Sequence, residues 1–408
     1  MKIVAYIEDG YLHRSLTDEI VTRIREVTKA DAMLVISEGN FLPEGTPVSV
    51  PHDVRAEEQV KNGADLVLEL PVTSSLSGSG GRNEGIVALI RKLDCVDEIA
   101  IIYNPVDEEK EEETQRLMWK CAEAIADDEK EYRARIIEAL KEESYFLDAQ
   151  VNALVACVPE AKKILNRSEN VMSIRIMSAM VHLEDLPKIT FLNVKSIIDR
   201  VVHETLLTIL DENFLAEHMH QGYLRKYDRN AADILQTMMK RKSESEMRDY
   251  MLTIAGKTEF AAEVILAHKS DIEAIHSFEE IVKKMERWLY GYLDKVAHKK
   301  AREDNTKVQE EMEKLEAQGM SRMAMRLYLL HVILNVKTED MIHFSRNAFC
   351  PYVNVIDQSE TGETIRLQLE KNSQIHFVNH EQLHTRGLEN DETEYYLDID
   401  RRAEILAF

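Results

Sequence analysis

Candidate phosphate-binding side chains follow the first apolar segment of the chain, Lys2–Ile7. The next residues, Glu8–Leu16, read EDGYLHRSL and place His13 beside Arg14. Polar and cationic side chains at a helix N-terminus can stabilise the charge on a phosphate during group transfer. The segment therefore suggests nucleotide chemistry, with Arg14 as its best candidate for contact with an anion.

The same segment has a second explanation that involves no ligand. Ser15 and Asp18 have the spacing of a capping box, which is a common way to begin a helix. Asp18 and Glu19 then occupy the first helical turn, and Glu8 and Asp9 precede it. Carboxylates at these positions stabilise a helix but repel a triphosphate. From the local sequence alone, a capped helix after a turn is the better explanation.

A second loop with functional character follows the apolar run Ala32–Ile36. Glu38-Gly39-Asn40 is a turn signal. The residues after it are kept irregular by Pro43, Gly45, Pro47 and Pro51. A loop this long at the end of a strand is usually functional, and the alternative is an ordered Ω-loop with no ligand. Composition does not decide between the two.

The elements that would position these loops alternate over the first 105 residues. Short apolar runs predict strands at Lys2–Ile7, Ala32–Ile36, Leu66–Leu70 and Ile99–Tyr103. Helical periodicity separates them at Thr17–Thr28, Val54–Asn62 and Asn83–Leu93. Such alternation predicts a parallel sheet with helices on both faces, which binds ligands at the carboxyl ends of its strands. Thr73–Arg82, TSSLSGSGGR, is expected to be a flexible loop at one of these ends.

Beyond about residue 108 the pattern becomes helical. Residues 195–240 and 258–335 are expected to form a helical bundle, with Lys299–Ala317 as an exposed helix or hairpin arm. Three short strands are expected near the C-terminus, at Tyr352–Ile356, Thr364–Leu369 and Gln374–Val378. The predicted domains are therefore residues 1–190 (α/β with a helical extension), 191–340 (bundle) and 341–408 (a small β element).

Composition restricts the classes of function. The chain has 408 residues and a formal net charge of −23, which weighs against general nucleic-acid binding but leaves room for a local basic patch. Its four cysteines form no CxxC pair, so no metal site is expected. No apolar run approaches the ~20 residues that span a bilayer, and the N-terminus does not look like a signal peptide. We therefore expect a cytoplasmic protein without a membrane partner.

Several motifs together resemble one known family. The specific matches to the tRNA(Met) cytidine acetate ligase family are Gly39-Asn40-Phe41, Gly45-x-Pro47, Arg55-Ala56-Glu57 and the run NGADLVLELP at Asn62–Pro71. Weaker matches lie at Arg167–Met180, Ser277–Glu280, Arg322–Val332 and Pro351–Val355. The resemblance covers nearly the whole chain. It implies a HIGH-type nucleotidylyltransferase-like Rossmannoid α/β domain, then a helical bundle and a small C-terminal β element.

The resemblance also implies a reaction. Members of that family use ATP to activate acetate as acetyl-adenylate, and then acetylate the wobble cytidine of elongator tRNA(Met). Carried over by position, His13 would be the catalytic histidine. The nucleotide-binding residues would be Gly10, Arg14, Gly39, Asn40 and Asn170. ATP is the expected cofactor, with Mg if the site is active, and tRNA and acetate are the expected partners.

The sequence departs from the family pattern at the expected pocket. The His-x-Gly-His motif is reduced to His13-Arg14-Ser15-Leu16, and His52-Asp53 stands where a lysine is expected. Losing one contact of the oxyanion-hole type costs roughly 3–4 kcal/mol of transition-state stabilisation. An alternative is therefore a catalytically degenerate paralogue that acts as an RNA- or protein-binding module.

Basic residues of the helical part are the candidates for RNA contact. They are Lys283, Lys284, Arg322 and Arg326. Acidic neighbours such as Glu279 and Glu280 support a second explanation, in which each cluster is a solvated helix face.

Overall fold

The computed structural model describes residues 1–8, 14–48, 50–127, 129–139, 146–200, 221–256, 261–301, 322–379, 382–383 and 391–407. The chain forms two compact units, and neither is continuous in sequence. Unit 1 consists of Met1–Pro43, Val48–His220 and Phe344–Arg401. Unit 2 consists of Glu44–Pro47, Gln221–His343 and Arg402–Phe408.

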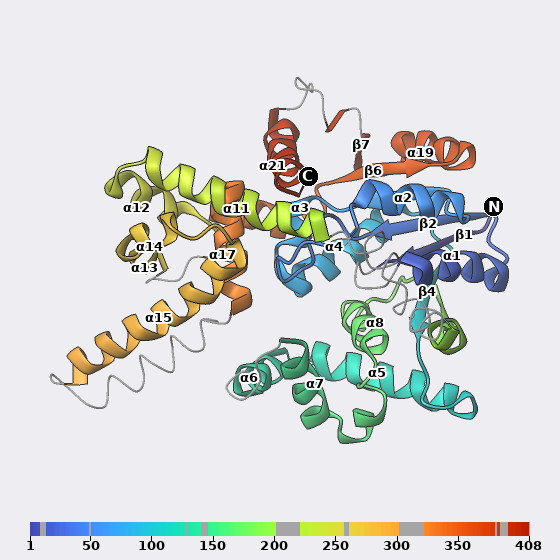
Figure 1. Ribbon diagram of the computed structural model, residues 1–408. Coiled ribbons are helices and arrows are strands. Elements are labelled where there is room, and N and C mark those ends of the chain that lie inside the picture. Colours follow the sequence, from blue (N-terminus) through green and yellow to red (C-terminus); the bar gives the residue numbers. More distant parts are fainter. Residues whose placement is uncertain are drawn as a thin grey trace. The chain divides into compact units, whose positions relative to one another are not determined.

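A seven-stranded sheet forms the centre of unit 1 (Figure 1). Its order is β5-β4-β1-β2-β3-β6-β7. The strands are β1 (Ile3–Ile7), β2 (Ala32–Ser37), β3 (Leu66–Glu69), β4 (Glu98–Tyr103), β5 (Lys188–Asn193), β6 (Tyr352–Gln358) and β7 (His376–Asn379). Neighbouring strands run parallel except that β6 is antiparallel to β3. The four N-terminal strands predicted from apolar runs are confirmed.

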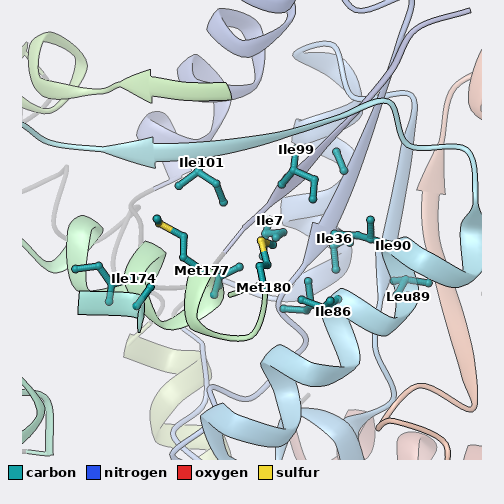
Figure 2. Close-up of a cluster of buried hydrophobic side chains, with 14 of the residues drawn as sticks. Ile7, Ile36, Ile86, Leu89, Ile90, Ile99, Ile101, Ile174, Met177 and Met180 are labelled. Atoms are coloured by element: carbon teal, nitrogen blue, oxygen red, sulfur yellow. The ribbon is translucent and has the colours of Figure 1, made fainter. Parts of the chain in front are cut away.

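Apolar side chains on both faces of the sheet explain why β1 to β4 are buried along their whole length. One face is covered by α4 (Gly78–Leu93) and α8 (Ser168–Ser178). Figure 2 shows Ile7, Ile36, Ile99 and Ile101 of the strands packed with side chains of these helices. The other face is covered by α1 (Arg14–Thr28), through Ile20, Val21 and Ile24.

One of the three strands expected in the C-terminal part of unit 1 is wrong. Thr364–Leu369 is not a strand but lies inside helix α19 (Glu360–Asn372). The Ser359 hydroxyl accepts a hydrogen bond from the Gly362 amide at 3.1 Å, which caps this helix at its N-terminus. The strands expected on either side of it are confirmed as β6 and β7, and both belong to the sheet that β1 to β4 form.

The remaining helices of unit 1 surround the sheet or pack on one another. They are α2 (His52–Lys61), α3 (Val72–Ser75), α5 (Glu111–Asp127), α6 (Glu129–Ala139), α7 (Phe146–Cys157) and most of α21 (Asp391–Ala407). The segment Thr73–Arg82, expected to be a flexible loop, is mostly helical because α3 and the start of α4 occupy it.

Unit 2 is helical, as the periodicity predicts. Its helices are α11 (Gln221–Arg241), α12 (Glu244–Thr253), α13 (Ala261–Ala267), α14 (Lys269–Glu273), α15 (Phe278–Ala301), α17 (Arg322–Leu334) and most of α18 (Thr338–Arg346). The exposed arm expected at Lys299–Ala317 lies outside the described residues after Ala301. Within the described part of the chain, no helix is both long and apolar enough to cross a membrane.

Candidate nucleotide site at the carboxyl edge of the sheet

The order of the strands locates the candidate site. The chain runs from β1 to β2 and β3 on one side, and β4 then lies on the other side of β1. Open α/β sheets bind their ligands at such a reversal, which lies here at the carboxyl ends of β1 and β4. Glu8 follows β1 at this edge, and Asn104 follows β4.

The predicted catalytic residue, His13, and two of the predicted nucleotide-binding residues, Gly10 and Arg14, belong to the segment after β1. Gly10 and His13 lie outside the described residues. Arg14 is the first residue of α1, and only its backbone is described. Their roles stay predictions that follow from the resemblance described above.

Arg55 of α2 connects the ends of two strands. Its Nη1 forms an ion pair with the Glu8 carboxylate after β1, and its Nη2 donates to the Gly39 carbonyl oxygen after β2 at 2.8 Å. Its Nε donates to the Val50 carbonyl oxygen at 3.1 Å. Arg55 and Glu8 are 7% and 1% exposed, so their charges neutralise each other away from water. The Arg55 guanidinium is therefore occupied by the protein itself.

A second buried pair lies beside the first. Arg82 of α4 places its Nε 2.5 Å from a Glu38 carboxylate oxygen, and its Nη2 donates to the Glu8 carbonyl oxygen at 3.3 Å. Arg82 and Glu38 are 3% and 2% exposed. No local sequence signal predicts either pair, because the partners are 47 and 44 positions apart along the chain. Both described arginines at this edge therefore have a carboxylate partner.

Gly39 and Asn40, the predicted lining of the site, are held by internal contacts. A Cβ atom on Gly39 would lie 2.5 Å from a Glu69 carboxylate oxygen, so a side chain at this position would have to displace that carboxylate. The Asn40 side-chain oxygen accepts from the His52 amide at 3.3 Å. The His52 ring contacts the Glu69 carboxylate, and both side chains are buried. The turn after β2 is thus fixed by a buried histidine–carboxylate pair.

Asn170, the remaining predicted nucleotide contact, is completely buried in α8. Its side-chain oxygen accepts from the Asn104 amide at 2.8 Å, and its side-chain nitrogen donates to the Asn104 carbonyl oxygen at 2.9 Å. The same nitrogen donates to the Ile164 carbonyl oxygen at 2.9 Å. In this arrangement Asn170 fixes the backbone at the end of β4, and its contact with a nucleotide stays a prediction.

A buried carboxylate of the C-terminal helix binds the backbone that follows β3 and two side chains of β6. Asp400 of α21 accepts hydrogen bonds from the Val72 amide at 2.9 Å, the Tyr352 hydroxyl at 2.9 Å and the Asn354 side chain at 3.1 Å. Burial raises the pKa of Asp400 to about 6, although these three donors oppose the shift. The neighbouring Glu69 charge raises it further.

The predicted RNA-binding residues of unit 2 differ in their surroundings. Arg326 forms a two-bond ion pair with Glu279, with distances of 2.9 and 2.7 Å, and its side chain is 12% exposed. Lys284 lies 3.2 Å from Glu280, and Lys283 is exposed. Only the backbone of Arg322 is described. Of the described side chains in this set, Lys283 is the one that solvent and an RNA phosphate could reach most directly.

A shallow depression of about 500 Å³ lies beside Lys284 in unit 2. It is lined by Asp271, Ala274, Ile275, His276, Ser277, Glu280 and Lys284. Two carboxylates against one amine do not favour a phosphate there. Across the described residues, no group of three or more His, Cys, Asp or Glu side chains is arranged to hold a metal ion.

Comparison with known proteins gives consistent matches over nearly the full length. A family model described as HIGH Nucleotidyl Transferase matches residues 20–406. A tRNA(Met) cytidine acetate ligase of Thermosipho melanesiensis is 22% identical over 386 residues, which cover 93% of this chain and 84% of that protein. One of Thermoanaerobacter sp. (strain X514) is 23% identical over 387 residues, with 92% and 87% covered.

A solved structure shares the fold. The crystal structure of Thermotoga maritima TmcAL bound with alpha-thio ATP matches with a TM-score of 0.62 and 17% identity. The match covers 99% of this chain and 93% of that one. The expected α/β nucleotidyltransferase-like fold with additional helices is therefore confirmed.

Proposed function

The chain belongs to the HIGH nucleotidyl transferase family, and on that basis we propose that it is a tRNA(Met) cytidine acetate ligase-like protein. The proposed reaction is ATP-dependent activation of acetate as acetyl-adenylate, followed by acetylation of a tRNA cytidine. The observation that carries the proposal is the extent of the likeness. The relatives with that name align with 92–93% of this chain.

The carboxyl edge of the sheet is the proposed site of ATP. His13 and Arg14 would contact the phosphates at the start of α1, where the helix dipole also favours an anion. Arg55 and Arg82 would act indirectly, because each neutralises a buried carboxylate that would otherwise repel the phosphates. Lys283 and Lys284 of α15 are the proposed contacts of unit 2 with the tRNA backbone.

A second function is supported by the charges at the same edge. Both described arginines there are paired with carboxylates, and Ser15 and Leu16 replace the glycine and second histidine of the motif. These features favour a catalytically degenerate paralogue that keeps the fold as an RNA-binding or protein-binding module.

One set of measurements separates the two functions. Calorimetric titration with ATP tests nucleotide binding, and acetate-dependent exchange of pyrophosphate into ATP tests formation of acetyl-adenylate. Mass spectrometry of nucleosides from treated tRNA(Met) tests acetylcytidine formation. The ligase proposal predicts all three signals and their loss in His13→Ala. No ATP binding and no exchange in the wild-type protein would overturn it in favour of the binding module.

Contact with RNA is tested separately from catalysis. Lys283→Glu combined with Lys284→Glu should weaken binding of tRNA(Met) by at least tenfold, and should reduce the dependence of binding on salt. The matched control is Lys188→Glu combined with Lys195→Glu in unit 1, which makes the same change of charge. Equal weakening by both double variants would show a general charge effect and would contradict an RNA surface on α15.

A further inference from the structure

The buried carboxylates of Glu69 and Asp400 both lie close to one residue, Asn354 of β6. Glu69 of β3 is directly opposite Asn354 in the antiparallel ladder, and residues in that relation have Cβ atoms about 4.5–5.5 Å apart. The Asn354 side-chain nitrogen donates to the Asp400 carboxylate at 3.1 Å. Glu69, Asn354 and Asp400 are 6%, 3% and 4% exposed. The three side chains therefore form one buried polar cluster that joins β3, β6 and α21.

The Glu69 end of this cluster holds the turn after β2. Its carboxylate contacts the His52 ring, and one of its oxygens occupies the space where a Gly39 Cβ atom would lie. The His52 amide donates to the Asn40 side-chain oxygen at 3.3 Å, and the Val48 amide donates to the Asn40 carbonyl oxygen at 3.1 Å. Glu69 is therefore the residue through which the cluster meets the Gly39–Asn40 turn.

The Asp400 end of the cluster attaches α21, which lies beside α3 and β6 (Figure 1). Asp400 accepts from the Val72 amide and from the Tyr352 hydroxyl, both at 2.9 Å. Burial raises the pKa of Tyr352, so its hydroxyl stays protonated and donating at neutral pH. Val72 is three positions after Glu69. The C-terminal helix is thus tied to the same short stretch of chain that holds the turn.

The cluster has more hydrogen-bond acceptors than donors. Besides the two carboxylates, it contains the Asn354 side-chain oxygen, which has no partner in the described part of the chain. Two carboxylates that share a buried site repel each other, and a bound proton removes that repulsion. A protonated carboxyl is also a donor, which the Asn354 oxygen lacks. Burial raises the pKa of Asp400 to about 6, and the Glu69 charge contributes to the shift.

We propose that Glu69 and Asp400 are positioning residues that couple α21 to the Gly39–Asn40 turn, and that a proton bound by the cluster strengthens this coupling. The consequence for the nucleotide rests on the proposed function, because that turn is the predicted lining of the ATP site. The coupling itself is a property of unit 1 and can be measured without a nucleotide.

The proton dependence has a defined sign. Ionisable groups that face the two carboxylates are His52 of α2, beside Glu69, and Tyr352 of β6, beside Asp400. Tyr396 of α21 acts on Tyr352 in turn. Asp400 binds its proton more tightly in the folded state, so the coupling is fully present at low pH and weakens as the pH rises through about 6.

Hydrogen–deuterium exchange of the full-length protein, followed by mass spectrometry of peptides, measures the coupling. Peptides that cover residues 38–48 report the turn, and peptides from α5 report the rest of unit 1. Asp400→Leu removes the acceptor of three hydrogen bonds, so the turn should exchange about tenfold faster while α5 is unchanged. Tyr352→Phe removes one donor and keeps the ring, so its effect should be about threefold in the same direction. This milder variant keeps the test available if Asp400→Leu does not fold.

Arg401→Gln is the matched control in the next residue of the same helix. Arg401 pairs with Glu394 at 2.6 Å and donates to the Leu383 carbonyl oxygen, so it attaches α21 without touching the cluster. Exchange in the turn should be unchanged in this variant. A conservative variant tests the proton: Asp400→Asn is neutral at every pH and resembles the protonated acid. Between pH 5 and pH 8, and after correction for intrinsic exchange rates, wild-type protection of the turn should fall while that of Asp400→Asn stays constant.

Calorimetric titration extends the test to the nucleotide. If the wild-type protein binds ATP, Asp400→Leu should raise the dissociation constant about fivefold, and Arg401→Gln should leave it unchanged. A wild-type protein that binds no ATP would contradict the ligase proposal, and the exchange results would still decide the coupling. The coupling is overturned if both Asp400→Leu and Tyr352→Phe leave exchange of the turn unchanged, or if Arg401→Gln accelerates it as much as Asp400→Leu. Parallel pH profiles of the wild type and Asp400→Asn would overturn the role of the proton.

Discussion

At the scale of single residues, the carboxyl edge of the sheet depends on contacts that leave no room for larger side chains. Gly39 is the clearest case, because Glu69 occupies the space where a Cβ atom would lie. That carboxylate also contacts His52, whose backbone amide binds Asn40. A change at Gly39 therefore disturbs the whole turn after β2.

Gly39→Ala should destabilise unit 1 by about 1–3 kcal/mol, because the new methyl group displaces the buried Glu69 carboxylate. Chemical denaturation at equilibrium gives the free energy of unfolding. Gly291→Ala in α15 is the matched control, since a Cβ atom there meets nothing within 4 Å. The control should be stabilising by about 0.5–1 kcal/mol, through helix propensity alone. Equal effects of the two variants would contradict the steric explanation.

Arg55 and Glu8 should behave as a coupled pair. Arg55→Met leaves the Glu8 carboxylate buried without its counter-ion, which should cost about 3–5 kcal/mol of unfolding free energy. Adding Glu8→Gln should recover part of the lost unfolding free energy, because the side chain that stays buried at position 8 is then neutral. A double-mutant cycle from denaturation curves measures the coupling. Simple additivity of the two changes would show that the ion pair has no energetic role.

At the scale of elements, the attachment of α21 is sensitive to pH. Asp400 is buried between α3 and β6, with Glu69 and Tyr352 as the ionisable groups that act on it. Its pKa rises from 3.8 to about 6 on folding, so the folded state binds the proton more tightly. The stabilisation that Asp400 contributes is therefore fully present below about pH 4 and is lost as the pH rises to about 6. Above that pH the contribution no longer changes.

Asp400→Asn should remove this component of the pH dependence. A shift of about two pKa units corresponds to roughly 3 kcal/mol between pH 4 and pH 7. The amide can be accommodated, because the Asn354 side-chain oxygen has no partner among the residues that the structure describes and can accept from it after rotation. Unfolding free energies of both proteins are measured from pH 4 to pH 8. The difference between wild type and variant should vary with pH up to about 6, and a constant difference would contradict the assignment.

The elements also show how far the sequence could predict the structure. β1 to β4 were predictable because each is a continuous apolar run, which is typical of strands covered on both faces. β5 gave no such signal, because its side chains are mostly half-exposed and its partner β4 lies about 90 positions away. α19 was mistaken for a strand, since Glu360–Glu363 looks like a turn until Ser359 is recognised as its cap.

The same reasoning explains what was missed at the site. The motif at Gly39-Asn40 can be recognised in the sequence. The contacts that explain it come from Glu69 and His52, which are distant in sequence. The pairs of Arg55 and Arg82 could not be predicted, because nothing local indicates which carboxylate each arginine meets.

At the scale of the whole molecule, the C-terminal segment is essential to unit 1. Seven buried side chains of the core face come from residues 350–377. At roughly 1.5–3 kcal/mol for each, their burial is comparable to the total stability of a typical domain. Polar contacts add to this: Ser359 donates its amide to the Asp65 carbonyl oxygen at 2.8 Å, and Lys92 donates to the Cys350 carbonyl oxygen at 2.5 Å.

A chain that ends at Arg346, the last residue of α18, should fail to unfold cooperatively and should aggregate on purification. Circular dichroism during heating and size-exclusion chromatography test this expectation. Co-expression with residues 347–408 as a separate polypeptide is the control, and it should restore a soluble complex that unfolds cooperatively. A stable, cooperative fragment 1–346 would show that the first five strands suffice.

The antiparallel pairing of β6 with β3 also has a consequence for synthesis on the ribosome. About 285 residues separate the two strands, and at roughly 5–20 residues per second their translation takes on the order of 15–60 seconds. During that interval β3 has been made but its outer edge has no partner, and an uncovered apolar strand readily pairs with other chains. The nascent protein therefore passes through a long period in which slow translation, crowding of ribosomes on one message, or scarcity of chaperones would favour misassembly.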